Sequence, residues 1–429
     1  MAAKRTVRGF LRLLDGLRPD MTSNLQPTSK WLAIVGIGED GVDGLGDEAK
    51  RCIADAEIIF GGKRHLALAA PLVTGEARAW PTPFDPEMRD VLALRGRNTC
   101  VLASGDPFLH GVGTTLARHV AVGEIRVIPS PSAFSLAASR LGWALQDVET
   151  ISLHGRPIEL IRPLLHPKTR ILALTSDADG PAAIAKLLTH LGFGTTRLTV
   201  LEALGGPNER LRSARADDFG LEEINPLNVL ALEIDSSRDA RILPLTPGMA
   251  DDLFEHDGQI TKREIRAMTL AALAPRRGEL LWDIGAGSGS ISIEWMLADP
   301  SMRAIAIEAE QDRAARIRRN ARACGVPGLT IVEGRAPEAL AGLETPDAVF
   351  IGGGGTGRGV MEAAIAALPS GGRLIGNAVT LEMEALLLAR QVELGGELTR
   401  IAVSRAAPVG TMQGWRPAMP VTQWSWVKP

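Results

Sequence analysis

The sequence predicts two consecutive α/β domains, each built around a largely parallel sheet. Strand-like and helix-like segments alternate from Trp31 to about Asp235, and again from about Gly278 to the end, which is the pattern of repeated βα units. With 429 residues the chain is longer than one ordinary domain. Two prolines and a glycine in Ile242–Met249 are typical of a linker. We therefore expect an N-terminal extension over 1–30, a first domain over 31–240, a linker over 241–250 and a second domain over 251–429.

The composition argues against two classes of partner, nucleic acids and membranes. Lys and Arg number 47 against 50 Asp and Glu, a net charge of −3, so a nucleic-acid partner, which favours a basic excess, is not expected. No apolar run approaches the roughly 20 residues of a membrane helix, so no membrane partner is expected either. Cys52, Cys100 and Cys324 lie far apart, which indicates a reducing, cytoplasmic compartment and predicts neither disulfides nor a metal site.

The first thirty residues differ from the rest. Four basic residues, Lys4, Arg5, Arg8 and Arg12, alternate with apolar ones, and no acidic residue precedes Asp15. This pattern fits a targeting helix or a helix on a membrane surface. We favour a loose terminal extension. Met21 opens a polar stretch before the first strand and is an alternative start.

The second half has the clearer strand pattern. A short apolar strand over Glu279–Asp283 is followed by a glycine loop and a helix over Ser290–Ala298. Further strands are expected at Arg303–Glu308, Leu329–Glu333, Asp347–Ile351, Arg373–Val379, Leu398–Val403 and Val421–Val427. Five βα units and a terminal pair of strands are the layout of the seven-stranded, Rossmann-like sheet of class I methyltransferases.

The glycine loop of this half predicts a nucleotide or nucleoside site. Gly285, Ala286, Gly287, Ser288 and Gly289 follow a strand and open a helix, so the backbone and the helix N-terminus can approach a ligand. A dinucleotide loop would prefer glycine at the sixth position, which is Ser290, and a plain tight turn is the structural alternative. Glu308, at the end of the next strand, can accept both ribose hydroxyls. Asp283 precedes the loop and can reach a methionyl ammonium, which favours S-adenosylmethionine.

A capping box is expected ahead of that loop. Thr261-Lys-Arg-Glu264 has the spacing of a helix start, and Ile265 and Met268 continue its buried face. The Thr261 hydroxyl is also placed to contact the cofactor if the helix end faces the cleft.

The first half has a glycine loop of its own, Gly36–Gly41, after the strand Trp31–Val35. Its spacing matches a dinucleotide loop, but Glu39 and Asp40 would place two negative charges beside a pyrophosphate. The next strand, Glu57–Phe60, ends in glycines and offers no acid for a ribose. The loop therefore suits a bulky ligand without phosphate.

Two more loops follow strands of the first half. Ser104–Gly111 comes after Thr99–Ala103, and the Ser-rich Pro129–Ser135 comes after Ile125–Ile128. A Gly-Asp-Pro turn is common in itself, so each loop is a weak signal when taken alone.

Together these motifs resemble two known families. Residues 31 to about 240 resemble the tetrapyrrole methylase family through Val35-Gly-Ile-Gly38, Ser104-Gly-Asp-Pro107, Pro131-Ser-Ala133 and Leu153-His-Gly-Arg156. Residues from about 245 to 429 resemble the precorrin C15-methyltransferase family. The segments that match it are Thr261–Glu264, Trp282–Gly287, Glu333–Pro337, Phe350–Gly354 and Gly376–Glu382. Their order along the chain resembles the decarboxylating C5,15-methyltransferases of cobalamin biosynthesis.

The resemblance implies a reaction. Two methyl groups would pass from two S-adenosylmethionine molecules to C5 and C15 of precorrin-6B, and the C12 acetate would leave as carbon dioxide, giving precorrin-8. A reduced tetrapyrrole is an extended enamine that attacks the sulfonium methyl directly, so the protein mainly aligns donor and acceptor. The conjugated ring can accept the electrons of the departing carboxylate, so no metal is required. A homo-oligomer is expected.

The resemblance also assigns residues. The second-half donor site would comprise Thr261, Asp283, Gly285 to Gly289, Glu308 and Ala336, and the first-half site Ser104, Gly105, Asp106, Leu109, Ser132 and Ala133. Asn377 and Glu382 are the catalytic candidates, while His110, His154 and Arg156 are candidates for substrate binding. Each of these five has an alternative role as a hydrogen bonder that fixes a loop. Lys262, Arg263, Arg358 and Arg405 are further candidates for the substrate's carboxylates.

Two positions depart from the family patterns. Arg335 stands where relatives of the second half usually have aspartate, and Glu39 stands where many tetrapyrrole methylases have proline. Two rival functions compete with this one. A nucleic-acid methyltransferase would need an aromatic after the fourth strand, where this chain has Gly352–Gly355. A non-catalytic sensor is disfavoured by the two complete glycine loops.

Overall fold

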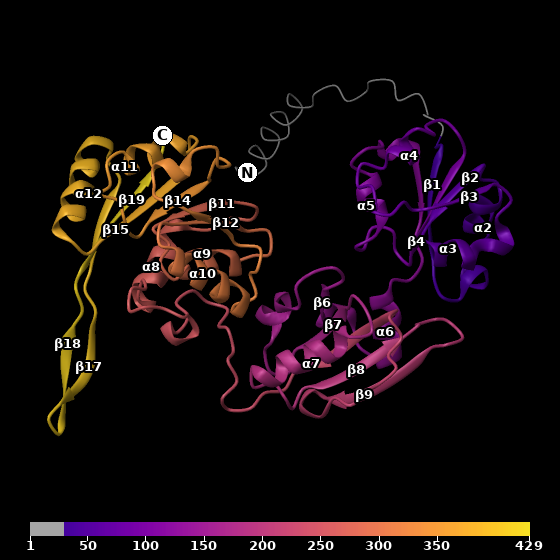
Figure 1. Ribbon diagram of the computed structural model, residues 1–429, viewed down its shortest axis with the longest axis horizontal. Coiled ribbons are helices and arrows are strands. Elements are labelled where there is room, and N and C mark those ends of the chain that lie inside the picture. Colours follow the sequence, from indigo (N-terminus) through magenta and orange to yellow (C-terminus); the bar gives the residue numbers. More distant parts are fainter. Residues whose placement is uncertain (1–29) are drawn as a thin grey trace, which may run out of the picture. The chain divides into compact units, whose positions relative to one another are not determined.

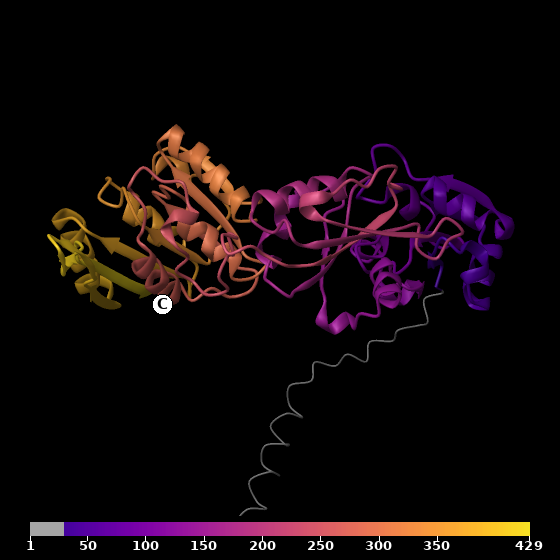
Figure 2. The same ribbon diagram turned by 90° about the horizontal axis from the view of Figure 1, so that it is seen from below.

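The computed structural model of the chain describes residues 30–429, which Figures 1 and 2 draw in colour. The extension expected over 1–30 therefore lies, apart from Lys30, outside the described residues. The described chain forms two compact units. One comprises 30–146, 201–211 and 227–229, and the other 147–200, 212–226 and 230–429. No helix within residues 30–429 has the length and apolar character needed to cross a membrane.

The first unit contains a five-stranded sheet in the order β3-β2-β4-β1-β5. β1 pairs in parallel with both β4 and β5, and β2 pairs in parallel with β3 and β4. Residues of β1 alternate between two buried clusters, with Leu32 and Ile34 in one and Ala33 and Val35 in the other, because successive side chains of a strand point to opposite faces. The strands are β1 Leu32–Ile37, β2 Ile58–Gly61, β3 Glu76–Ala79, β4 Thr99–Ser104 and β5 Ile125–Ile128. The helices are α2 Asp47–Ala54, α3 Lys63–Ala69, α4 Arg89–Leu92, α5 Val112–Leu116 and α6 Ala133–Leu141.

A second five-stranded sheet follows, in the order β6-β7-β10-β8-β9. Its members are β6 Glu149–Ser152, β7 Arg170–Leu174, β8 Arg197–Glu202, β9 Arg210–Arg215 and β10 Asn228–Glu233, with α7 Gly180–His190 between β7 and β8. Apolar residues of these elements, among them Ile171, Leu188 and Leu230, form one buried cluster. The first half is thus α/β, as predicted, but it is built on two sheets.

The C-terminal part forms the predicted seven-stranded sheet, in the order β13-β12-β11-β14-β15-β19-β16. The pairs from β13 to β15 are parallel, and β19 runs antiparallel to both β15 and β16. Helices α8, α9 and α10 cover one face and α11 and α12 the other (Figure 1). The strands are β11 Leu280–Ile284, β12 Arg303–Glu308, β13 Thr330–Glu333, β14 Ala348–Ile351, β15 Arg373–Ala378, β16 Glu397–Ile401 and β19 Val421–Val427. The helices are α8 Arg263–Leu273, α9 Ser290–Leu297, α10 Gln311–Ala323, α11 Val360–Ala367 and α12 Leu381–Leu394.

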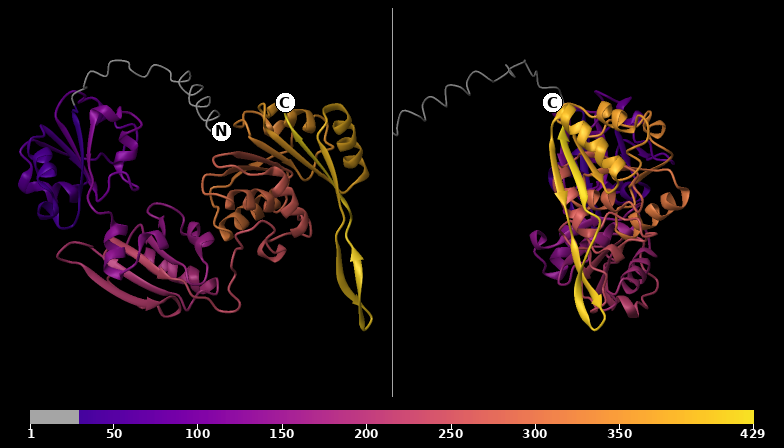
Figure 3. Two further views of the ribbon diagram at one scale, coloured as in Figure 1. Left: turned by 180° about the vertical axis from the view of Figure 1, so that it is seen from behind. Right: turned by 90° about the vertical axis from the view of Figure 1, so that its left-hand side faces the viewer.

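A long hairpin between β16 and β19 was not predicted. Its strands, β17 Ser404–Val409 and β18 Met412–Pro417, pair with each other and form a separate two-stranded sheet. They extend away from the seven-stranded sheet (Figure 3). Most of their side chains are exposed, including Met412 at 74% and Trp415 at 76%.

The segment predicted as a linker packs onto the C-terminal core. Met249 is buried there, and the backbone N–H groups of Gly248 and Met249 donate to the Glu294 carboxylate at 2.6 and 3.0 Å. Arg266, which is fully buried, donates to the same carboxylate at 2.6 Å. Charges this deep are retained only when they are paired and hydrogen-bonded. The domain boundary at 241–250 stays a prediction.

The predicted capping box does not form. Helix α8 begins at Arg263, and its N-cap residue, Lys262, makes no side-chain cap bond. The Thr261 carbonyl accepts a hydrogen bond from Arg266, and Glu264, expected to bond back to the cap, pairs with Arg405 instead. A long-range ion pair thus takes the glutamate side chain that the capping box would need.

Candidate active site

A cavity of about 880 Å³ opens at the carboxyl edge of the seven-stranded sheet. The carboxyl ends of neighbouring parallel strands meet there, which is where ligands bind in open α/β sheets. Of the second-half residues predicted to bind the donor, all but Gly289 line this cavity: Thr261, Asp283, Gly285, Ala286, Gly287, Ser288, Glu308 and Ala336. Gly289 is buried against α10 instead, because a Cβ there would lie 2.7 Å from Ile317.

The glycine loop needs glycine for steric reasons. Gly285 has a φ of +73°, and a Cβ on it would lie 2.5 Å from the carbonyl oxygen of Gly353. The loop after β11 and the loop after β14 therefore touch through their backbones, which only a residue without a side chain allows.

Asp283 places an unpartnered carboxylate oxygen at this cavity. Its Oδ2 accepts from the Ser292 hydroxyl at 2.6 Å and the Ser292 N–H at 3.2 Å, whereas Oδ1 is buried and has no hydrogen-bond partner among residues 30–429. Burial raises the pKa of Asp283 to about 6. The hydrogen bonds from Ser292 oppose this rise, and the charge of Glu308 adds to it. A buried acceptor without a partner has a large favourable interaction available to a cationic ligand.

Glu308 is held by backbone donors. The Gly287 N–H donates to its Oε2 at 2.8 Å and the Glu310 N–H to its Oε1 at 3.0 Å. Each carboxylate oxygen keeps a second lone pair, so the side chain can still accept hydroxyl groups from a ligand. The donor set therefore fits a ligand with one ammonium and one diol, as S-adenosylmethionine has.

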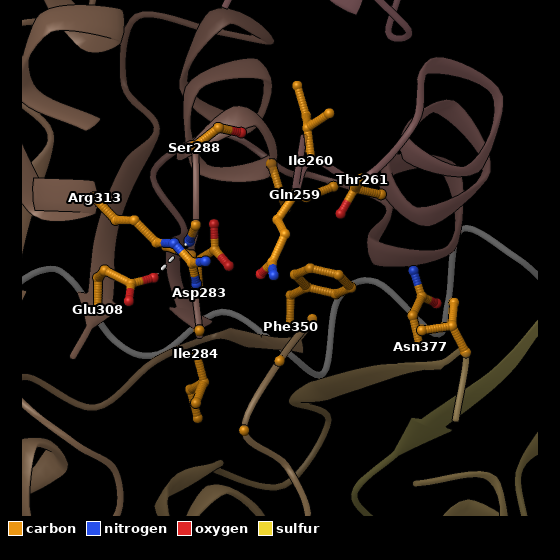
Figure 4. Close-up of a pocket in the computed structure, with 18 of the residues that line it drawn as sticks. Gln259, Ile260, Thr261, Asp283, Ile284, Ser288, Glu308, Arg313, Phe350 and Asn377 are labelled. Atoms are coloured by element: carbon orange, nitrogen blue, oxygen red, sulfur yellow. Dashed lines mark hydrogen bonds between the residues drawn. The ribbon is translucent and has the colours of Figure 1, made fainter. Parts of the chain in front are cut away.

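The cavity has two sides. Figure 4 shows Asp283, Glu308 and Arg313 on one side and Thr261 and Asn377 on the other, with Phe350 and Gln259 between them. Arg313, Phe350 and Gln259 were not among the residues predicted for this site. Arg313 lies in the first turn of α10, the helix that follows the strand ending at Glu308, and this position is the signal that could have found it.

The two catalytic candidates lie in different surroundings. Asn377, on β15, lines the cavity, and its amide is oriented by neighbours because Nδ2 donates to Thr269 at 2.9 Å and Oδ1 accepts from Gln423 at 2.9 Å. Glu382, in the first turn of α12, is exposed and does not line the cavity.

The predicted loops of the first unit meet at the carboxyl edge of its sheet. The Ser130 N–H donates to the Gly105 carbonyl at 3.1 Å, and the Ser130 hydroxyl donates to the Gly36 carbonyl at 2.8 Å. A Cβ on Gly105 would lie 2.7 Å from the Pro131 carbonyl oxygen. Ser132 caps α6 by accepting from the Ser135 N–H at 3.1 Å, and Ala133 is the first residue of that helix.

Other predicted residues of the first half are exposed or held by local contacts. Asp106 accepts from the Phe108 N–H at 2.8 Å, and Leu109 is 41% exposed. His110 has a φ of +56°, a conformation that strains a non-glycine residue. His154 and Arg156 are exposed and lie in the other compact unit, on the turn after β6.

Ser104 belongs to a polar cluster that was not predicted. Its hydroxyl lies 2.8 Å from His65 Nε2 and accepts from Arg64 Nη2 at 2.9 Å, and Arg64 also pairs with Glu39. Burial, followed by the charge of Arg64, lowers the pKa of His65 to about 4. His65 is therefore neutral at physiological pH. Glu39, whose charge argued against a pyrophosphate, is neutralised by this pair.

A seven-stranded sheet with a glycine loop between a buried strand-end aspartate and a second strand-end glutamate defines the class of S-adenosylmethionine-dependent methyltransferases. Two family models match the chain: tetrapyrrole (corrin/porphyrin) methylases over residues 32–220 and a precorrin methyltransferase domain over residues 252–428. The precorrin-6Y C(5,15)-methyltransferase [decarboxylating] of Sinorhizobium sp is 64% identical over 408 residues, which cover 95% of this chain and 99% of that protein. The chain belongs to the family of decarboxylating precorrin-6Y C(5,15)-methyltransferases.

Two shorter relatives match part of the chain. A probable cobalt-precorrin-6B C(15)-methyltransferase (decarboxylating) of Pyrobaculum calidifontis is 36% identical over 172 residues, 38% of this chain and 88% of that protein. The crystal structure of the C-terminal domain of precorrin-6Y C5,15-methyltransferase from Rhodobacter capsulatus is 50% identical. The match covers 43% of this chain and 100% of the crystallised domain, with a TM-score of 0.42.

Proposed function

We propose that the chain methylates precorrin-6B at C5 and C15 and removes the C12 acetate carboxyl, giving precorrin-8 in cobalamin biosynthesis. The observation that carries this proposal is the buried Oδ1 of Asp283, which has no hydrogen-bond partner within residues 30–429, at a cavity that Glu308 also lines. S-adenosylmethionine would supply the methyl group when bound there. Asp283 would hold its ammonium, Glu308 its ribose hydroxyls, and the glycine loop would let the backbone approach it.

We propose further that the chain uses two donor sites, one in each α/β half. The second would lie where Gly36, Gly105 and Ser132 come together at the carboxyl edge of the first sheet. His110, His154 and Arg156 remain proposals for substrate binding by this half. Titration calorimetry of the full chain with S-adenosylhomocysteine should saturate at two molecules per chain, and saturation at one would contradict the proposal.

The two activities are assigned to separate halves. The Pyrobaculum relative carries C15 methylation and decarboxylation in its name and matches only 38% of this chain, which supports the precorrin methyltransferase domain over 252–428 as the place of both events. C5 methylation then belongs to the first half. Asn377 and Glu382 remain the catalytic candidates of the second half, and Asn377 is favoured because it lines the cavity.

Mass spectrometry of the product tests both assignments. The full chain, supplied with donor and precorrin-6B, should add two methyl groups and remove one carboxyl. Asp283→Ala should abolish one methylation together with the decarboxylation while leaving C5 methylation intact on a suitable substrate. If Asp283→Ala stops methylation but the carboxyl is still lost, the two events do not share this site.

We propose that the chain forms a homo-oligomer through the hairpin β17–β18. An isolated two-stranded hairpin is only marginally stable in water, and this one exposes Val409, Met412 and Trp415. A second copy that packs on these side chains would cover them. Trp415→Ser should lower the mass measured by light scattering, and an unchanged mass would reject this interface.

A cytoplasmic location is also proposed. Cys52, Cys100 and Cys324 are all free thiols. Free thiols persist in a reducing compartment. Cell fractionation should recover the chain with cytoplasmic markers.

A further inference from the structure

The base of the hairpin forms part of the cavity wall. Besides the glycine loop, the cavity is lined by Lys262 and Glu264 from the start of α8, by Val403 and Arg405 at the start of the hairpin, and by Met419 at its end. The loops at the strand ends of the seven-stranded sheet therefore form one side of the cavity, and the base of the inserted hairpin forms another.

This base is fixed to the domain. Ile265 of α8, Ile401 of β16 and Val421 of β19 form a small buried cluster, against which Val403 packs. The Ala418 N–H donates to the Val403 carbonyl at 2.8 Å and closes the base of the hairpin. The packing of the hairpin base therefore fixes the backbone position of Arg405.

The cavity wall carries charges of both signs. Asp283 and Glu308 lie beside the glycine loop, and Arg313 on the same side already pairs with Asp257. Lys262 and Arg405 come from the start of α8 and from the hairpin, and Glu264 lines the cavity with them. Acids suit the cationic methyl donor. The cations suit an anionic acceptor, and a substrate that undergoes decarboxylation carries at least one carboxylate.

Both cations are held by partners that a carboxylate can displace. Arg405 pairs with Glu264, and the two side chains are 48% and 44% exposed. Lys262 Nζ lies 3.9 Å from Asp251, whose carboxylate also accepts from Arg266 at 3.2 Å. Exposed ion pairs contribute little net stability, so a substrate carboxylate competes with them easily.

We propose that Arg405 and Lys262 form a carboxylate-binding subsite for the methyl acceptor, which Glu264 occupies until a substrate carboxylate displaces it. Arg263 and Arg358, which looked equally suitable in the sequence, do not line the cavity. The inference rests on the proposed function, because it assumes that the acceptor is a carboxylated tetrapyrrole. It makes the hairpin base a determinant of specificity.

Two substitutions in the full chain, which should change KM in opposite directions, test the subsite. Arg405→Ala should raise KM for the precorrin substrate at least tenfold, since a charge-assisted hydrogen bond is lost, and KM should become less sensitive to salt. Glu264→Gln removes the competitor and should lower KM three- to tenfold. A purely structural ion pair would not give this improvement, because breaking it from either side would be harmful.

Arg400→Ala is the matched control. Arg400 also pairs with a glutamate, at 2.6 Å from Glu384, and is 59% exposed, but it does not line the cavity. Its KM should equal that of the wild type. An unchanged KM in Arg405→Ala, a raised KM in Glu264→Gln, or an equal rise in Arg400→Ala would each overturn the subsite.

Two further measurements separate this inference from the proposed function. S-adenosylhomocysteine should bind Arg405→Ala as it binds the wild type, because Arg405 lies outside the donor set. If the wild-type chain fails to methylate and decarboxylate the precorrin, the proposed function fails. If the wild type turns over and the variants do not differ, only the subsite fails.

Discussion

Replacing Asp283 by asparagine should weaken donor binding and, at the same time, stabilise the ligand-free protein. The substitution keeps the shape of the side chain and its contact with Ser292, which donates at 2.6 Å. It removes only the charge from a group that is 1% exposed and has one oxygen without a partner among the described residues.

The gain in stability follows from the raised pKa of Asp283. The pKa rises from 3.8 to about 6 on folding, chiefly through burial, so the folded state binds the proton more tightly than the unfolded state does. Stability is therefore lost as the pH rises from about 4 to about 6, and the loss amounts to roughly 3 kcal/mol above pH 6. Asparagine avoids this loss but has a weaker hydrogen bond from Ser292, so we expect a net gain of about 1–3 kcal/mol at pH 8. The two proteins should become equal, or reverse their order, below pH 4.

The loss of affinity follows from the same charge. Removing one partner of a buried ion pair costs about 3–5 kcal/mol, so the C-terminal site should bind S-adenosylhomocysteine at least about 100-fold more weakly. In the wild type, affinity at this site should rise as the pH increases through about 6, because the carboxylate must be ionised.

Thermal denaturation at pH 4 and pH 8, together with titration calorimetry, would measure both effects. At pH 8 the variant should melt on the order of 5 °C higher than the wild type, while one of two binding events disappears from the calorimetric trace. The remaining event, which the proposed second donor site should give, serves as an internal control. A variant that is less stable at pH 8, or that keeps two equal sites, would refute the reasoning.

Three further predictions concern packing, the glycine loop and the N-terminus. Glu294→Gln should lower the free energy of unfolding by about 3 kcal/mol, because it removes the negative charge that pairs with the fully buried Arg266. Chemical denaturation measures this change, and a loss below about 1 kcal/mol would contradict the prediction. Gly285→Ala should remove donor binding at the C-terminal site only, since the alanine Cβ would lie 2.5 Å from the Gly353 carbonyl oxygen. Titration calorimetry that still finds two intact sites would count against this prediction. A protein that begins at Met21 should keep full activity, because residues 1–20 precede the first predicted strand. If this shortened protein is inactive, residues 1–20 have a role in the activity.

Much of the site could be predicted because it depends on local sequence and on one topological rule. An aspartate at the end of one strand, a glycine loop and a glutamate at the end of the next strand must come together once the strands pair in parallel. The register of β11 with β12 shows this, with Asp283 level with Ala306 and Ile284 level with Ile307, one residue before Glu308. Asp283, Glu308 and the loop between them therefore needed no tertiary information.

The hairpin could not be predicted from its sequence. Residues 404–417 contain glycine, proline and arginine and show no apolar alternation, in keeping with a hairpin whose side chains are mostly exposed in the described part of the chain. The expected capping box failed for the converse reason. Thr261 and Glu264 have suitable spacing, but α8 begins at Arg263 with Lys262 as its N-cap residue, and Glu264 pairs with the distant Arg405.

The sequence by itself determined the two α/β halves, most of the strands along the C-terminal half and the acids that frame the glycine loop, because hydrophobic periodicity and strand-end chemistry are local properties. Only the tertiary structure decided which polar residues from distant parts of the chain join Asp283 and Glu308 at the cavity. Asn377 is oriented by Thr269 and Gln423, which lie 108 and 46 residues away in the chain, and Arg405 meets Glu264 across 141 residues. Pairings over such separations depend on how helices and strands pack, and no local pattern encodes that packing.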